Sequence, residues 1–188
     1  MIPDIEPSGF LPVGRYSCSL NEVRTRFVDS KSYAQSVTRR GIWSDFLDYL
    51  FALRSLTPVC AVWIAGSFIS RKVNPNDIDV VLLLDGEELD ARFPDMSVQA
   101  KNFLFASGRG HLGWADLRIP LKVDTYTVTW RAFMNGNPND NNRINYFSWR
   151  GYWDDFWQRC RSNQPSSLRR DSRPERGYLE VVLDGYGQ

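Results

Sequence analysis

The sequence is poor in the residues on which several common kinds of site depend. It has a single histidine, His111, and only three cysteines, Cys18, Cys60 and Cys160. The cysteines are odd in number, lie far apart and match no spacing of metal ligands, so we assign them no chemistry. Cys60 opens a strongly apolar segment, where a buried and inert thiol is expected.

Long apolar runs and an excess of one charge are also absent. No segment reaches the roughly 18 uncharged apolar residues of a membrane span, so no contact with a membrane is expected. Residues 1–7 are acidic and proline-rich rather than basic and apolar, unlike a secretory signal, which predicts a cytoplasmic protein. The formal net charge is only +1, so the field of the whole molecule does not indicate a nucleic-acid-binding protein.

The composition that remains is suited to one domain of ordinary size. The 188 residues are 43% hydrophobic and 24% charged, which is enough to bury a core. Prolines and glycines recur through residues 1–18 and predict an extended N-terminal arm. Residues 19–188 are expected to form a single domain, with a catalytic core at about 59–130 and a C-terminal aromatic helix and strand at 145–184.

Hydrophobic periodicity and turn residues predict a chain of mixed secondary structure. Ser19 and Glu22 form a capping-box pattern at the start of the first helix. The helices are expected at 20–28, 32–56, 86–107 and 146–160. The strands are expected at 59–65, 78–84, 119–130 and 178–183, with a loop at 135–142. This pattern favours the α+β class.

The most informative segment begins where the apolar strand 59–65 ends. Gly66 follows the strand at once, and its missing side chain would let the backbone approach a ligand closely. Ser67 adds a hydroxyl and an N–H group at what should be the first turn of a helix. Backbone donors at such a turn form an anion site that suits a phosphate group.

Two aspartates follow after a short loop. Asp77 and Asp79 flank Ile78, and alternate residues of a strand share a face, so the two carboxylates should point the same way. Neighbouring like charges repel unless a cation lies between them. Magnesium prefers carboxylate oxygens and leaves room for substrate phosphates, and manganese is the alternative cation. A phosphate turn joined to a metal-binding pair is typical of phosphoryl transfer.

A third acid is needed for a second metal ion or to activate an attacking hydroxyl. Asp124 lies in the middle of an expected strand, where aspartate is disfavoured unless it has a function. Asp116 is the competing candidate, but it lies at a loop end, where aspartate is ordinary. We therefore predict Asp77, Asp79 and Asp124 as the metal ligands and catalytic residues.

Gly66-Ser67, the Asp77 and Asp79 pair, and the strand-borne Asp124 together resemble the signature of the polymerase-beta-type nucleotidyltransferase superfamily. This superfamily includes minimal nucleotidyltransferases of toxin–antitoxin systems and aminoglycoside-modifying nucleotidyltransferases. The chain is similar more narrowly to small bacterial and phage proteins of this kind, of the toxin–antitoxin or phage-defence type. That similarity covers nearly the full length, but only residues 63–81 are specific.

The resemblance implies a twisted mixed β-sheet with helices packed on one face. It also implies two magnesium ions at Asp77, Asp79 and Asp124, and a nucleoside triphosphate whose β- and γ-phosphates contact Ser67. Gly66 and Lys72 complete the expected nucleotide-binding set. The chain departs from many minimal members in having Asn76 directly before the acidic pair, where they have Arg-Gly or a second serine.

Several neighbouring residues have two interpretations each. Arg71 and Lys72 either neutralise triphosphate charge or solvate their loop, with Lys72 favoured as the ligand. His111 is expected to be a surface residue rather than a base. The aromatic segment at 145–160 could stack nucleic-acid bases, but packing in the core or docking of a protein partner is favoured. The arginines of residues 159–176 either contact RNA phosphates or form a solvated linker.

The sequence therefore predicts a magnesium-dependent nucleotidyltransferase. It would move a nucleoside monophosphate, with AMP from ATP as the expected case, to a hydroxyl of an acceptor protein or RNA and release pyrophosphate. One alternative is a catalytically silent binding subunit of the same fold, acting as an antitoxin-like or regulatory partner. Another is a metal-dependent nuclease, which would use the aspartates but would not need Ser67.

Overall fold

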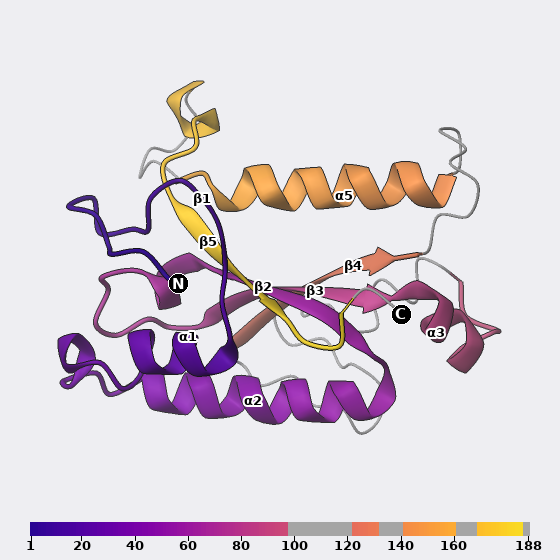
Figure 1. Cartoon of the computed structure of the whole chain (residues 1–188), viewed down its shortest axis with the longest axis horizontal. Helices are drawn as coiled ribbons and strands as arrows, with labels where there is room; N and C mark the ends of the chain where they lie inside the picture. The colour runs from indigo at the N-terminus through magenta and orange to yellow at the C-terminus, as the bar shows by residue number, and fades with distance from the viewer. Residues whose placement is uncertain (98–121, 132–140, 161–168, 186–188) are drawn as a thin grey trace.

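A five-stranded mixed β-sheet forms the centre of the computed structural model, which describes residues 1–97, 122–131, 141–160 and 169–185 (Figure 1). The strands are β1 (Gly14–Ser17), β2 (Val59–Ala65), β3 (Ile78–Asp85), β4 (Val123–Trp130) and β5 (Gly177–Val182), in the order β1-β5-β2-β3-β4. The outer pairs, β1 with β5 and β3 with β4, run parallel. Strand β2 is antiparallel to both of its neighbours.

Helices cover both faces of this sheet. They are α1 (Leu20–Phe27), α2 (Arg39–Leu56), α3 (Gly86–Arg92) and α5 (Asn141–Trp157). Figure 1 shows α1 and α2 along one face of the sheet and α5 across the other. The architecture is the mixed α+β type expected from the sequence, but the expectation that helices pack on one face is wrong for α5.

Burial on both sides of the central strands explains the position of α5. All seven residues of β2 are buried, and alternate side chains of a strand point to opposite faces. On β4, Tyr126 packs against Trp153 of α5 with ring centroids 4.3 Å apart. The adjacent Thr125 is hydrogen-bonded to Tyr49 of α2. Without α5, the apolar side chains on its face of the sheet would be left in water.

Most predicted elements are present with shifted ends. The capping box of Ser19 and Glu22 is confirmed, with Ser19 N–H donating to the Glu22 carboxylate at 2.8 Å. The helix expected at 32–56 is divided into a 3₁₀ turn, η1 (Lys31–Tyr33), and α2. Helix α5 begins inside the predicted loop at 135–142. None of the helices in the described part of the chain is long and apolar enough to cross a membrane.

The N-terminal segment takes part in the sheet. Strand β1 lies within the predicted arm of residues 1–18 and pairs with β5, Gly14 opposite Gly177. Leu11 is buried in the core. Arg71 binds the same segment, because its N–H donates to the Gly9 carbonyl at 2.8 Å and its guanidinium donates to the Glu6 carbonyl at 2.9 Å. Arg71 thus fastens the N-terminal segment to the loop that precedes β3.

A buried arginine organises that loop. Arg39 begins α2, is 1% exposed, and its guanidinium lies 3.7 Å from the ring centre of Tyr33. It donates five hydrogen bonds to backbone carbonyls, those of Phe27, Phe68, Ser70, Lys72 and Val73. Burial lowers the pKa of Arg39 to about 10, so the side chain stays charged at neutral pH. Four of the five acceptors belong to residues 68–73, which follow the Gly66-Ser67 turn.

Replacing Arg39 by alanine is expected to lower the free energy of unfolding by about 3–5 kcal/mol, because several buried carbonyls lose their donor at once. Urea unfolding followed by tryptophan fluorescence measures this loss. Arg40→Ala is the matched control, since Arg40 is the exposed neighbour in the same helix turn. Equal effects of the two substitutions would contradict the role given to Arg39.

Candidate functional site

The predicted site residues gather at one end of the sheet. Strand β2 ends there at Ala65, and a 3₁₀ turn, η2 (Gly66–Ile69), follows directly. Strands β3 and β4 both begin there, because they run parallel and Ile78 pairs with Val123. The Ile78 N–H also donates to the Lys122 carbonyl at 2.9 Å, which ties the two strand starts together.

Asp79 and Asp124 are register partners on β3 and β4. Side chains at paired positions of neighbouring strands point to the same face of the sheet. That face is the one covered by α5, since Tyr126 shares it with Asp124 and contacts Trp153. The structure thus brings together two acids that lie 45 residues apart in the sequence.

Gly66 leaves space for the Asp79 carboxylate. Its backbone has a φ of 75°, in the left-handed region that favours glycine. A Cβ atom placed on Gly66 would lie 1.7 Å from Asp79 Oδ2. The register of β2 and β3, with Ala65 opposite Asp79, produces this contact. The glycine is therefore required by the position of the acid as well as by the turn.

Burial and neighbouring charges raise the proton affinity of Asp79. Burial, the larger cause, and the negative charges of Asp77 and Asp124 together raise the pKa of Asp79 to about 6, while the positive charge of Arg176 opposes the shift. Asp77 lies just before β3 and is partly exposed. At neutral pH the ionised Asp79 is held in an unfavourable field, which a cation between the carboxylates would relieve.

Tyr126 is a site residue that sequence reasoning missed. Its hydroxyl donates to Asp124 Oδ2 at 3.1 Å. The two residues are two positions apart on β4, so the alternation of the strand places them on one face. That spacing was visible in the sequence, but tyrosine is common in strands and gave no signal of its own. Tyr126 orients the Asp124 carboxylate.

The donor set suits a hard divalent cation, although the side chains do not already enclose one. The three groups offer only carboxylate oxygens, which magnesium and manganese prefer over nitrogen and sulfur ligands. Within the part of the chain that the structure describes, no three or more His, Cys, Asp or Glu side chains are grouped for a metal ion. Binding would therefore require the carboxylates to turn toward a common point.

The expected phosphate-binding residues differ in whether their side chains are already bound by other residues. Ser67 is partly exposed, its carbonyl accepts from the Ser70 hydroxyl at 2.8 Å, and its own hydroxyl has no hydrogen bond to any described residue. Lys72 is exposed, and its ammonium group likewise makes no ion pair within the described residues. Arg71, the alternative to Lys72, is bound to the N-terminal segment instead.

Some sequence candidates cannot be placed beside this site. Asp116 and His111 lie outside the described residues. Lys122 is described and exposed at the start of β4. Its backbone carbonyl is used by β3. Of the two candidates for the third acid, only Asp124 belongs to the described residues, where it pairs with Asp79.

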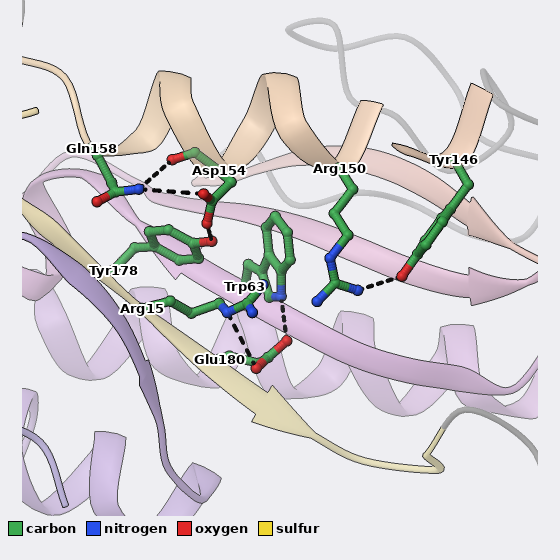
Figure 2. Close-up of polar contacts among 8 residues, drawn as sticks. All are labelled: Arg15, Trp63, Tyr146, Arg150, Asp154, Gln158, Tyr178 and Glu180. Carbon is green, nitrogen blue, oxygen red and sulfur yellow. Dashed lines mark hydrogen bonds and ion pairs between the residues drawn. The ribbon is translucent and has the colours of Figure 1, made fainter. Parts of the chain in front are cut away.

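A cluster of polar contacts lies between α5 and the sheet (Figure 2). On the sheet side, Trp63 Nε1 donates to Glu180 at 2.8 Å, and Arg15 pairs with the same carboxylate at 3.6 Å. On the helix side, the Tyr178 hydroxyl donates to Asp154 of α5. Asp154 also contacts Gln158, whose amide donates to the Asp154 carbonyl at 3.0 Å. The hydrogen bond between Tyr178 and Asp154 therefore joins the C-terminal half of α5 to β5.

The aromatic helix divides into two faces. Trp153 and Trp157 are 7% and 2% exposed and pack on Tyr126 and Tyr178. Trp149 and Tyr152 are about half exposed. Core packing thus accounts for one face of the helix, and the other face is presented to solvent.

Asp79→Asn is expected to stabilise the metal-free protein at pH 7.5. The folded-state pKa of about 6 exceeds the ordinary value of 3.8, so the wild type loses stability as pH rises from about 4 to about 6. Asparagine does not ionise and avoids this loss, a gain on the order of 1–3 kcal/mol. Thermal unfolding between pH 4 and 8 measures it, with Asp48→Asn on the exposed side of α2 as the control. A variant less stable than wild type at pH 7.5 would contradict the electrostatic account.

Gly66→Ala is expected to destabilise the protein and disturb the acids, because the new methyl group would overlap Asp79 in a backbone conformation that alanine disfavours. We expect a loss of about 2–4 kcal/mol in chemical unfolding. Gly41→Ala is the control, since nothing lies within 4 Å of its Cβ position inside α2. That change should be neutral or stabilise by up to about 1 kcal/mol.

Comparison with known proteins places the chain in a family. The sequence profile of a family of unknown function, DUF6932, matches residues 3–182, which includes every described strand and helix. No curated protein and no solved structure gave a significant match. The matched range contains the whole candidate site, from Gly66 and Ser67 to Asp124 and Arg176. The chain is a member of the DUF6932 family.

Proposed function

We propose that the protein is a magnesium-dependent nucleotidyltransferase that transfers a nucleoside monophosphate from a nucleoside triphosphate to an acceptor hydroxyl. ATP is the proposed donor, and a protein or RNA supplies the hydroxyl. The observation that carries the proposal is the pairing of Asp79 with Asp124 on adjacent parallel strands, directly beside the Gly66 turn. Clustered carboxylates next to a backbone turn suit phosphoryl transfer.

Each residue has a distinct part in this proposal. Asp77 and Asp79 would hold the metal ions, and Asp124 would hold one of them while accepting the proton of the acceptor hydroxyl. Tyr126 keeps the Asp124 carboxylate oriented through its 3.1 Å hydrogen bond. Ser67 would contact the phosphates that leave. Bound magnesium would neutralise charge on the phosphate oxygens and strengthen the acceptor as a nucleophile.

The reaction balances without a further reactant. The acceptor oxygen forms a bond to the α-phosphorus, and the bond from that phosphorus to the bridging oxygen breaks. The electron pair leaves with pyrophosphate, and the proton of the hydroxyl passes to Asp124 and then to solvent. Most of the rate enhancement would come from positioning and charge stabilisation.

The direct test is transfer of label from each of the four α-³²P-labelled triphosphates. The purified protein is incubated with Mg²⁺ and a cell lysate as the source of acceptors. Label is expected on a protein or RNA band, with the rate lowered by about 100-fold or more in Asp79→Asn and Asp124→Asn, because each loses a metal ligand. Asp48→Asn, which alters an exposed acid of α2, should behave like wild type.

Two results would argue against the proposal. Absence of both transfer and pyrophosphate release with every triphosphate would sink the enzymatic function. Cleavage of nucleic acid that survives Ser67→Ala but is lost in Asp79→Asn would indicate a metal-dependent nuclease instead. The Asp79 and Asp124 variants should be shown to be folded by circular dichroism before either conclusion is drawn.

A catalytically silent binding subunit is the second candidate. It is favoured by the solvent-exposed aromatic side chains of α5, since Trp149 and Tyr152 are 50% and 49% exposed. Exposed aromatic groups are common at protein interfaces. A stable partner that copurifies with the wild type, is lost in Trp149→Ala/Tyr152→Ala, and accompanies no triphosphate turnover would support this function.

A further inference from the structure

Arg176 is a basic residue whose position is fixed from three sides. Its N–H donates to the Gln158 carbonyl at 3.1 Å, and the preceding Glu175 N–H donates to the same carbonyl at 2.7 Å. Its side-chain Nε donates to the Trp157 carbonyl at 3.0 Å. The next residue, Gly177, is packed so closely that a Cβ there would lie 2.1 Å from the Pro12 carbonyl oxygen. Little freedom remains for this part of the backbone.

The strand register places Arg176 beside the candidate site. Ile64 of β2 pairs with Leu179 of antiparallel β5. Ala65, the last residue of β2, comes next and lies level with Tyr178, so Arg176, just before β5, lies at the end of the sheet where the Gly66–Ile69 turn begins. Ala65 pairs on its other side with Asp79 of β3. Arg176 therefore lies at the same end of the sheet as the Gly66-Ser67 turn and the Asp79 carboxylate.

The terminal nitrogens of Arg176 are not consumed by these acids. Within the described residues, Arg176 forms no ion pair, and its only side-chain hydrogen bond is the one from Nε. A guanidinium held at Nε still presents the N–H groups of its two terminal nitrogens in a planar fork. Such a fork matches two oxygens of a phosphate group.

We propose that Arg176 binds the β- and γ-phosphates of the triphosphate opposite Ser67 and stabilises the pyrophosphate that leaves. This inference rests on the proposed function. When the bond to the α-phosphorus breaks, negative charge accumulates on the leaving group, and a fixed cation at that point stabilises it without reorganising. The carbonyl of Trp157 holds the guanidinium in place, so the end of α5 forms one side of the triphosphate site.

The competing role is structural, because a basic side chain that donates to the last carbonyls of a helix also stabilises that helix. If Arg176 only caps α5, Arg176→Ala should lower the melting temperature and weaken the binding of all nucleotides equally. A role in binding the leaving group predicts a loss that depends on the number of phosphates. The ratio of affinities for ATP and AMP separates the two.

Isothermal titration with ATP, AMP and inorganic pyrophosphate, each with Mg²⁺, provides the test. In Arg176→Ala we expect affinity for ATP and pyrophosphate to fall by about 10- to 100-fold and affinity for AMP to change by less than about threefold. Arg176→Lys should be intermediate, since it keeps the charge but not the fork. Arg173→Ala, three residues earlier and exposed, is the matched control and should bind all three like wild type.

The outcomes separate this inference from the proposed function. If the wild type transfers label but Arg176→Ala keeps the wild-type ratio of ATP to AMP affinity, the role of Arg176 is wrong and the transferase stands. If the wild type neither binds ATP nor transfers label, both are overturned. If Arg173→Ala shows the same selective loss as Arg176→Ala, general basic charge of the segment is responsible and the specific assignment fails.

Discussion

The contact between the Asp79 carboxylate and the Cα of Gly66 is the constraint around which the candidate site is built. A side chain on Gly66 would occupy the place of the carboxylate, so the turn after β2 and the acid on β3 are fixed by one another. The same acid faces Asp124 across the parallel pair of strands. Like charges in a half-buried place are unfavourable, and folding alone gives no reason to gather them. The proposed site for a cation and its anionic substrate would give that reason.

The surrounding structure holds this arrangement from outside. Arg39 binds the Phe68 carbonyl in η2 and three carbonyls of the loop between η2 and β3, and Arg71 joins that loop to the N-terminal segment. On the opposite face of the sheet, Asp154 and the Tyr178 hydroxyl attach α5 above β5. Both faces of the sheet therefore contribute to the shape of one end of it, although only one face carries the acids.

The sequence was sufficient for the elements whose signal is local. The apolar run of β2 and the capping box at Ser19 are both properties of short segments. Asp124 was selected from its position in an expected strand, and the resemblance added to that choice, but its pairing with Asp79 was not predicted, since strand register is a long-range property. Arg176 was assigned to a solvated or RNA-binding segment, because nothing near it in the sequence shows that β5 runs alongside β2.

The position of α5 and the role of Arg39 could not be predicted from the sequence either, because both depend on long-range contacts. Helix α5 was recognised as aromatic, but which face of the sheet it covers depends on how much apolar surface α1 and α2 leave uncovered. Arg39 lies in an ordinary amphipathic helix, and its five acceptors come from segments up to 34 residues away. A buried arginine without a carboxylate partner has no sequence pattern of its own.

The strand order also bears on how the protein is made. Strand β5 follows every other described strand along the chain, yet it lies between β1 and β2 in the sheet. While the chain grows on the ribosome, β1 and β2 emerge long before β5. The strand edges that later pair with β5 remain unpaired during that time. The sheet closes only after residues 177–182 have left the exit tunnel, and the acids on β3 cannot meet Arg176 earlier. Assembly of the site is thus coupled to the synthesis of β5, and a chaperone that shields β2 during that interval would suit this topology.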